Sequence, residues 1–380
     1  MIIIDFYLYF SAASALSYII AMLACTYGWM RLPRFEASKH NNHTTTISIL
    51  IAARNEAENI ESCLKSIEKQ SYPKNLFEVI VINDHSEDAT FELAKATNIS
   101  NLRVLQLADY GVKGSKKKAI ETGVGEAKGK LIVTTDADCV VQPDWLRLIA
   151  EYYEMHQPKL IAAPVNFHHE KNTFERCQSL DFLGLMAVTG AGIELKQISM
   201  CNGANLIYER AVFHEVEGFK GIDQLASGDD MLLMQKIALK YPDGIAYLKN
   251  TDATVFTFAK EDWKSFISQR VRWASKMNAY KEFTITAVLI MVFFFCCNIP
   301  LSLLLIPFLP KIAIPMFLIQ CLLKTILDFT LLYKISDFFD RKDLLKVGFP
   351  AFWFHVGYVV LVGVLASVLY NYEWKGRYVR

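Results

Sequence analysis

The sequence predicts an α/β domain with a mostly parallel sheet, flanked by membrane-spanning helices at both ends of the chain. Between about residues 44 and 280, short apolar runs alternate with amphipathic stretches at the spacing of βαβ units. Long, nearly uncharged segments lie before and after this region, and 53% of the 380 residues are hydrophobic. We therefore expect an N-terminal transmembrane anchor (1–30), an α/β domain (44–280) and a C-terminal region of about three transmembrane helices (285–370).

The first apolar segment, residues 2–30, is interrupted only by Asp5 and is long enough to cross a membrane. A signal peptide would be shorter, with a basic residue ahead of it and a small-x-small cleavage site near its end. The segment has none of these features. We interpret it as a retained anchor.

Three further apolar segments follow near the C-terminus: residues 285–309, 312–332 and 347–369. Pro300, Pro307 and Pro310 lie in or beside the first of them, so it is expected to be kinked, tilted or partly re-entrant. Lys324 and Asp328 are one helical turn apart inside the second. Because charges at membrane depth are costly, they should pair with each other or face a cavity.

Basic residues beside these segments predict the topology. One group follows the first span: Arg31, Arg34 and Lys39. The other group lies between the third and fourth spans: Lys334, Arg341, Lys342 and Lys346. The N-terminus is then outside, and the large middle section is in the cytoplasm of a multi-pass integral membrane protein (plasma or inner membrane in a bacterium). The basic tail, 374–380, would lie outside against the rule, so one segment does not span fully or the tail is an exception.

Composition excludes some functions and leaves others open. The net charge is +1, and no basic stripe with interleaved aromatic residues suggests nucleic acid as a partner. The eight cysteines have no metal-ligand spacing and are interpreted as small buried hydrophobic residues. The oligomeric state cannot be predicted.

Within the middle section we expect strands over 47–52, 77–82, 102–107 and 131–135, and helices over 57–69, 88–95 and 115–127. Asp136 and Asp138 follow the fourth, buried strand, at the sheet edge where open α/β folds bind ligands. Two carboxylates so close favour a divalent cation that bridges phosphates; the alternative is a helix N-cap and a solvated turn. No Gly-x-Gly-x-x-Gly follows the first strand and no P-loop motif is present, so a sugar nucleotide fits better than a dinucleotide.

Six motifs occur in a characteristic order: residues 51–56, 81–88, 116–123, 136–138, 227–230 and 269–273. Together they resemble the membrane-bound inverting glycosyltransferases of family 2, with the GT-A fold, a group that includes ceramide glucosyltransferase and the hyaluronan and chitin synthases. The resemblance covers residues 47 to about 273. It implies a metal-dependent transferase that uses Mg²⁺ or Mn²⁺.

The resemblance also implies a donor site. Glu56 would contact the nucleoside, Asp84 the uracil ring and Lys116 the phosphates; Asp136 would contact ribose or metal, and Asp138 would bind the metal. Asn83 and His85 replace the usual Asp and Gly of the second motif. The three lysines at 116–118 could otherwise be a solvated helix start.

On the acceptor side, the resemblance implies that Asp230 is the general base, with Asp229 in the position of the usual Glu; N-capping of a helix is the alternative. Gly203 lies in a small-residue loop expected near the acceptor. In the Gln-x-x-Arg-Trp motif, Gln269 and Trp273 would line the acceptor entrance and Arg272 would pair with the diphosphate; a snorkelling Arg and an interfacial Trp are the alternative.

Residues 174–195 are either an interfacial helix that delivers a lipid acceptor or a buried core helix. The function we predict is metal-assisted transfer of a sugar from a nucleoside diphosphate, most simply UDP, to a lipid or membrane-associated acceptor, with inversion. A processive polysaccharide synthase is the alternative, although four spans offer little material for a polymer channel. A hypothesis of another class is a non-catalytic membrane scaffold that retains the fold. The sequence identifies neither the sugar nor the acceptor.

Overall fold

The computed structural model describes residues 2–38, 43–112, 114–197, 200–223, 228–275, 283–368, 372–374 and 377–379. Lys39, and Ser227 at the start of the 227–230 motif, lie outside these ranges. The chain forms two compact units. The helical unit comprises Met1–Leu32, Glu170–Ser199 and Ala259–Tyr372, and the sheet unit comprises Pro33–His169, Met200–Phe258 and Glu373–Arg380.

The sheet unit is built on a seven-stranded sheet in the order β3-β2-β1-β4-β8-β6-β9. Its strands are β1 (Ile47–Ala53), β2 (Phe77–Asn83), β3 (Leu102–Gln106), β4 (Leu131–Asp136), β6 (Leu160–Ala162), β8 (Leu206–Glu209) and β9 (Ile245–Tyr247). The first four are parallel neighbours, as predicted, while β8 is antiparallel to both β4 and β6. Ile49, Leu50 and Ile51 are fully buried, which explains why the central strand is apolar on both faces.

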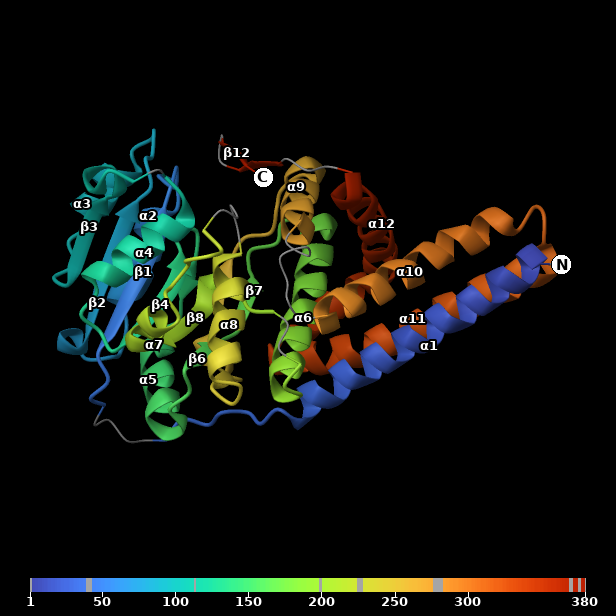
Figure 1. Cartoon of the computed structure of the whole chain (residues 1–380), viewed down its shortest axis with the longest axis horizontal. Coiled ribbons are helices and arrows are strands. Elements are labelled where there is room, and N and C mark those ends of the chain that lie inside the picture. Colours follow the sequence, from blue (N-terminus) through green and yellow to red (C-terminus); the bar gives the residue numbers. More distant parts are fainter. Residues whose placement is uncertain are drawn as a thin grey trace. The chain divides into compact units, whose positions relative to one another are not determined.

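Helices connect these strands and are visible beside the sheet in Figure 1. They are α2 (Ile60–Glu68), α3 (Thr90–Ala96), α4 (Lys116–Glu126), α5 (Trp145–His156), α7 (Arg210–Glu215) and α8 (Asp229–Lys240), with 3₁₀ turns at η1 (Lys74–Leu76), η2 (Leu107–Tyr110), η3 (Gly203–Asn205) and η4 (Thr251–Ala253). Helix α2 begins three residues later than the helix predicted over 57–69. Asn55 has a φ of 52° and the chain turns through residues 57–59 before it becomes helical.

Two small sheets complete the strands. One has the order β5-β10-β7, from Val140–Val141, Val255–Thr257 and Val165–Phe167. The other pairs β11 (Tyr372–Trp374) with β12 (Arg377–Val379). Strands of two to three residues offer too short an alternation to be predicted from sequence.

The helical unit contains α1 (Ile2–Arg31), α6 (Thr173–Glu194), α9 (Trp263–Ala274), α10 (Phe283–Leu305), α11 (Pro310–Phe338) and α12 (Gly348–Val368), with the 3₁₀ turn η6 (Lys342–Val347). Within the described ranges, four stretches are long and apolar enough to cross a membrane: Ile4–Arg31, Thr286–Leu305, Pro310–Phe338 and Lys342–Ser367. They correspond to the four predicted spans. Helix α10 continues through Pro300 and ends at Leu305, earlier than predicted.

Helix α1 packs along α10 and α11, as Figure 1 shows, and also against α6. At the contact with α6, a Cβ on Gly28 would lie 2.9 Å from the carbonyl oxygen of Ala191, and a Cβ on Gly190 would lie 2.9 Å from the Trp29 ring. Small residues at these positions allow the two helices to approach closely. This packing favours the core-helix alternative for residues 174–195.

The charged residues inside α11 pair with each other, which confirms the first of the two alternatives predicted for them. Lys324 Nζ lies 2.6 Å from Asp328 Oδ2 and donates a hydrogen bond of 3.1 Å to the Tyr18 hydroxyl of α1. The Tyr18 hydroxyl in turn donates to Asp328. The Lys324 side chain is fully buried, so its charge is neutralised inside the helix packing.

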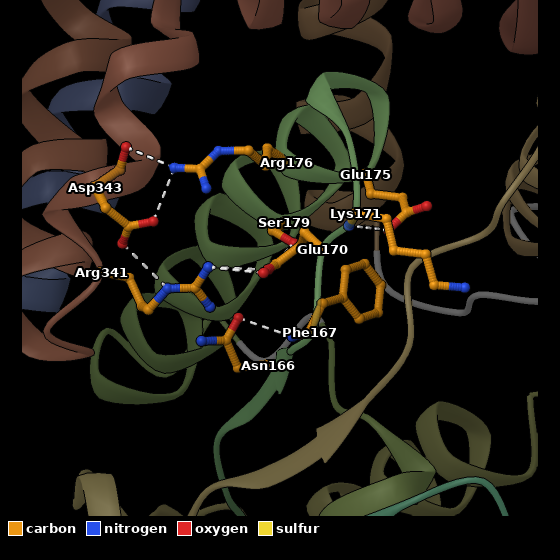
Figure 2. A network of polar contacts seen from close by, with 9 residues as sticks. All are labelled: Asn166, Phe167, Glu170, Lys171, Glu175, Arg176, Ser179, Arg341 and Asp343. Atoms are coloured by element: carbon orange, nitrogen blue, oxygen red, sulfur yellow. Dashed lines mark hydrogen bonds and ion pairs between the residues drawn. The ribbon is translucent and has the colours of Figure 1, made fainter.

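A second polar network fastens the start of α6 to η6 (Figure 2). Arg341 Nη2 contacts both carboxylate oxygens of Glu170, at 2.9 and 3.0 Å, and Ser179 donates to the same carboxylate at 2.5 Å. Asp343 accepts from Arg176 at 2.8 Å and from Arg341 at 3.2 Å. Arg341 was one of the basic residues used to predict the topology, and its charge is paired within this unit.

Candidate active site

The carboxyl ends of three neighbouring parallel strands bring the polar residues of the sheet unit to one edge. Ala52 of β1 is in register with Ile82 of β2 on one side and with Asp136 of β4 on the other. Asp84, directly after β2, donates its backbone N–H to the carbonyl of Ala53 at 2.8 Å. The predicted site residues after the first, second and fourth strands therefore lie along one edge, as the topology requires.

Lys116, the first residue of α4, reaches this edge. Its Nζ lies 2.5 Å from Asp136 Oδ1 and 3.7 Å from Asp229 Oδ2, and its side chain is 22% exposed. Burial alone would lower the pKa of this ammonium, but the charges of Asp136 and Asp229, with the hydrogen bond to Asp136, raise the pKa above its ordinary value. Lys116 is thus positively charged at neutral pH.

The three consecutive lysines have three different environments, so the alternative of a solvated helix start is wrong for two of them. Lys117 is buried and donates to the carbonyl of Ile222 at 2.5 Å. Lys118 has a half-buried side chain that pairs with Glu121 at 2.7 Å. The N-cap of this helix is Ser115, whose hydroxyl accepts from the backbone N–H of Lys118.

Asp229 and Asp230 form the first turn of α8, after Gly228, which is the N-cap with a φ of 83°. Asp230 Oδ2 accepts from the Gly203 N–H at 3.0 Å, and Oδ1 accepts from the Met231 N–H at 2.8 Å. Neither aspartate is the N-cap itself, which weakens the capping alternative. The helix N-terminus nevertheless favours both negative charges.

Gly203 lies close to Lys116 and also to Asp229 and Asp230. A Cβ at this position would lie 3.5 Å from Lys116 Nζ, 3.5 Å from Asp230 Cβ and 3.6 Å from Asp229 Oδ2. Its carbonyl accepts a 2.7 Å hydrogen bond from Thr134 Oγ1 of β4. The loop predicted to lie near the acceptor thus adjoins the predicted base, and the absent side chain leaves the space between them open.

Asp136, Asp138 and Cys139 each place a ligand atom within 4.8 Å of the others. Strand β5 follows them rather than a helix, so the N-cap alternative for the two aspartates is wrong. The Cys139 thiol donates to Asp138 Oδ1 at 3.6 Å, and burial, with the charge of Asp138, raises its pKa well above the ordinary value. The two carboxylates supply oxygen donors, which fit Mg²⁺ or Mn²⁺.

Arg54 braces the turn that contains Asp84. Its Nη1 donates to the carbonyls of Asp84, at 3.1 Å, and His85, at 2.7 Å, while Nη2 lies 3.1 Å from Glu87 Oε1. His85 takes a φ of 55°, where the family has Gly, and its Nδ1 lies 3.2 Å from Asp84 Oδ1. The unusual residue therefore retains the left-handed turn that glycine would adopt.

Glu56 lies in the turn between β1 and α2. Its Oε2 accepts from Asn59 Nδ2 at 2.8 Å, and its backbone N–H donates to Thr90 Oγ1 at 2.7 Å. It precedes the helix instead of belonging to its first turn. Its contact with a nucleoside stays a prediction.

Gln269, Arg272 and Trp273 lie on α9 in the helical unit. Gln269 Oε1 is buried and has no hydrogen-bond partner among the described residues. The Trp273 ring packs 6.3 Å from that of Phe182. The roles predicted for these three residues stay predictions.

The sequence did not identify Arg54, Thr134 and Cys139 as neighbours of the predicted site residues. The position of Cys139 directly after the Asp-x-Asp motif was a usable signal. Thr134 gave none, because its contact with Gly203 depends on the antiparallel insertion of β8 beside β4.

Comparison with known proteins agrees with this architecture. Residues 48–217 match the model of the family described as "Glycosyl transferase family 2". The chain is 34% identical over 106 residues to glycosyltransferase AglE of Haloferax volcanii, covering 26% of this chain and 33% of that protein. It is 25% identical over 231 residues to poly-beta-1,6-N-acetyl-D-glucosamine synthase of Staphylococcus aureus, covering 60% of this chain and 53% of that one. The chain thus spans about a third to a half of the length of these relatives.

Among solved structures, the mannosyltransferase PcManGT from Pyrobaculum calidifontis, in complex with GDP-Man and Mn²⁺, is similar with a TM-score of 0.58 and 16% identity, covering 95% of this chain and 98% of that one. At this identity the likeness shows the fold. The sheet order, the matched family model and this structural likeness agree on one conclusion. The chain carries a glycosyltransferase family 2 domain, matched over residues 48–217, with the GT-A fold.

Proposed function

We propose that this protein is a membrane-bound, inverting glycosyltransferase that moves a sugar from a nucleoside diphosphate to a lipid or membrane-associated acceptor. The observation that supports it most directly is the Lys116 ammonium between Asp136 and Asp229, with Asp230 held beside Gly203. Four helices apolar enough to cross a membrane support attachment to a bilayer. The basic residues beside the spans favour a cytoplasmic catalytic domain.

The donor would lie along the carboxyl edge of the sheet. Asp84 would accept a hydrogen bond from the base, Glu56 would contact the nucleoside, and Lys116 would offset the negative charge of the diphosphate. The second motif favours a uracil base, whereas the structurally similar mannosyltransferase binds GDP-Man. Both nucleotides therefore belong in the test.

Asp136 and Asp138 would hold a divalent cation, because their carboxylate oxygens lie close together. Mn²⁺ is present in the similar mannosyltransferase structure. When bound, such an ion would stabilise the negative charge that develops on the leaving nucleoside diphosphate. Either Mg²⁺ or Mn²⁺ suits this oxygen donor set.

Asp230 would be the general base. Its two oxygens are oriented by the N–H groups of Gly203 and Met231, and each retains a lone pair for a further hydrogen bond. Asp229 instead faces the Lys116 ammonium. In the reaction, the acceptor hydroxyl oxygen forms a bond to the anomeric carbon as the bond to the phosphate oxygen breaks. The hydroxyl proton passes to Asp230, and the bonding electrons leave with the nucleoside diphosphate.

The remaining proposed roles belong to residues of α9 and are based on the Gln-x-x-Arg-Trp motif. Arg272 would pair with the diphosphate, and Gln269 and Trp273 would contact the acceptor. The buried Gln269 Oε1 is an acceptor suited to a hydroxyl group.

A second candidate is a processive polysaccharide synthase. The similarity to poly-beta-1,6-N-acetyl-D-glucosamine synthase over 231 residues favours it. The non-catalytic scaffold is the weakest hypothesis, because a scaffold has no need for four acidic groups and a lysine at one sheet edge.

The test uses the full chain in native membranes with radiolabelled UDP- and GDP-sugars. We expect label in an organic extract; label in a polymer would select the synthase, and none in either would reject the proposal. The Asp230→Asn variant should lose at least about 100-fold in rate. Asp144→Asn is the matched control, since Asp144 pairs with Arg147 at the start of α5 and has no role in the proposed chemistry.

A further inference from the structure

A buried ion pair joins α6 to α9 within the helical unit. Arg270 Nη2 lies 2.9 Å from Asp181 Oδ2, and the two side chains are 4% and 6% exposed. The Tyr358 hydroxyl of α12 donates to the other oxygen, Asp181 Oδ1, at 2.8 Å. His355 Nε2 lies 4.0 Å from the same oxygen. One carboxylate of α6 therefore contacts two other helices.

The Arg270 guanidinium is also enclosed by aromatic rings. Its central carbon lies 4.4 Å from the centre of the Trp273 ring, 4.9 Å from Phe266 and 5.5 Å from Tyr358. Phe266, Arg270 and Trp273 are spaced by four and three residues, so they share one face of α9. The ion pair and the rings together fix the rotation of this face.

The rotation of α9 determines where its other residues point. Successive residues are separated by roughly 100° around a helix, so Gln269 and Arg272, three residues apart, project together on one side of the buried face. Apolar packing alone would tolerate small rotations, whereas a charge pair with two defined oxygens has one favoured geometry. Buried ion pairs of this kind add specificity of arrangement more reliably than stability.

We propose that Asp181 is a positioning residue: through Arg270 it sets the rotation of α9 and thereby the direction of Gln269 and Arg272. The expected effect on catalysis rests on the proposed function, whereas the expected effect on the rotation of α9 does not. Asp181 touches neither donor nor acceptor in this proposal.

The experiment compares four variants of the full chain in detergent micelles or native membranes: Asp181→Asn, Arg270→Met, the double variant, and Glu170→Gln. The last is the matched control, because Glu170 and Arg341 form an equally close ion pair, at 2.9 Å, between segments of the same unit that lie outside α9. Asp181→Asn should lower kcat/KM for the donor by about 30- to 100-fold, and Glu170→Gln by less than about threefold. The double variant should be no worse than either single one, because both changes break the same contact.

A structural readout separates this inference from the proposed function. Ser268 is an exposed residue of α9, and a Ser268→Cys background permits maleimide labelling at that position to be followed by peptide mass spectrometry. Asp181→Asn should change the labelling rate at position 268 by about threefold or more, while Glu170→Gln leaves it unchanged. Equal labelling and equal kinetics in the two variants would overturn the positioning role. A wild-type protein that transfers no sugar would reject the proposed function, and the labelling result would still decide the role of Asp181.

Discussion

Lys116 Nζ lies 2.5 Å from Asp136 Oδ1, which joins the first residue of α4 to the last residue of β4. This contact links the phosphate-binding lysine that the family motif implies to the first carboxylate of the Asp-x-Asp pair. Asp229 is the second acidic neighbour of the same ammonium, at 3.7 Å. Two carboxylates from distant parts of the chain are thus held near each other by one cation.

Replacement of Lys116 should therefore impair donor use strongly. Lys116→Met removes the charge and leaves Asp136 and Asp229 to repel each other, so kcat/KM for the donor should fall by about 100-fold. Lys116→Arg keeps the charge and should retain part of the activity. Lys118→Met, which removes only the pair with Glu121 on the same helix, is the control and should stay within about twofold of wild type. Equal losses in the two methionine variants would contradict the role of Lys116.

Metal binding should depend on Asp138 and not on Cys139. Because Mg²⁺ and Mn²⁺ prefer oxygen ligands to sulfur, Cys139→Ala should keep the Mn²⁺ affinity within about threefold of wild type, whereas Asp138→Asn should lower it by at least about tenfold. Electron paramagnetic resonance of Mn²⁺ titrated into each variant measures this directly. Chelation should abolish transfer in wild type, and added Mg²⁺ or Mn²⁺ should restore it. Loss of bound Mn²⁺ in Cys139→Ala would instead make the thiol a ligand.

We expect Arg54 to affect nucleotide affinity because it stabilises the turn that contains Asp84 and His85. Arg54→Met leaves the carbonyls of Asp84 and His85 without this donor, at a cost of about 2 kcal/mol in stability and a rise of about tenfold in donor KM. Arg54→Lys should recover only part of the affinity, because an ammonium does not reproduce the planar fork of a guanidinium. Calorimetric titration with UDP and GDP measures the effect. Glu87→Gln serves as the control, since the Glu87 side chain is 79% exposed and its ion pair contributes little.

The sequence was sufficient to predict those parts of the fold whose signals are local. The four parallel strands and the four apolar helices have long, regular patterns, and the polar residues after β1, β2 and β4 follow from topology alone. The short strands β6 and β9 and the contact of Thr134 with Gly203 could not be predicted, because they depend on tertiary pairing. Asp181 was overlooked for the same reason: a single carboxylate in an apolar helix is informative only once Arg270 is seen beside it.

The pair formed by Lys324 and Asp328 offers a test of the helical unit that does not involve the candidate site. Asp328→Asn leaves the fully buried Lys324 ammonium without its carboxylate, and should destabilise the protein by about 3 kcal/mol. Adding Lys324→Met to Asp328→Asn removes the unpaired ammonium, so the double variant should recover at least half of the stability lost in Asp328→Asn. Thermal unfolding in detergent micelles measures both, with Thr325→Val on the exposed side of the same helix as the control. A double variant less stable than Asp328→Asn would show that Lys324 stabilises the helices through contacts other than this pair, such as its hydrogen bond to Tyr18.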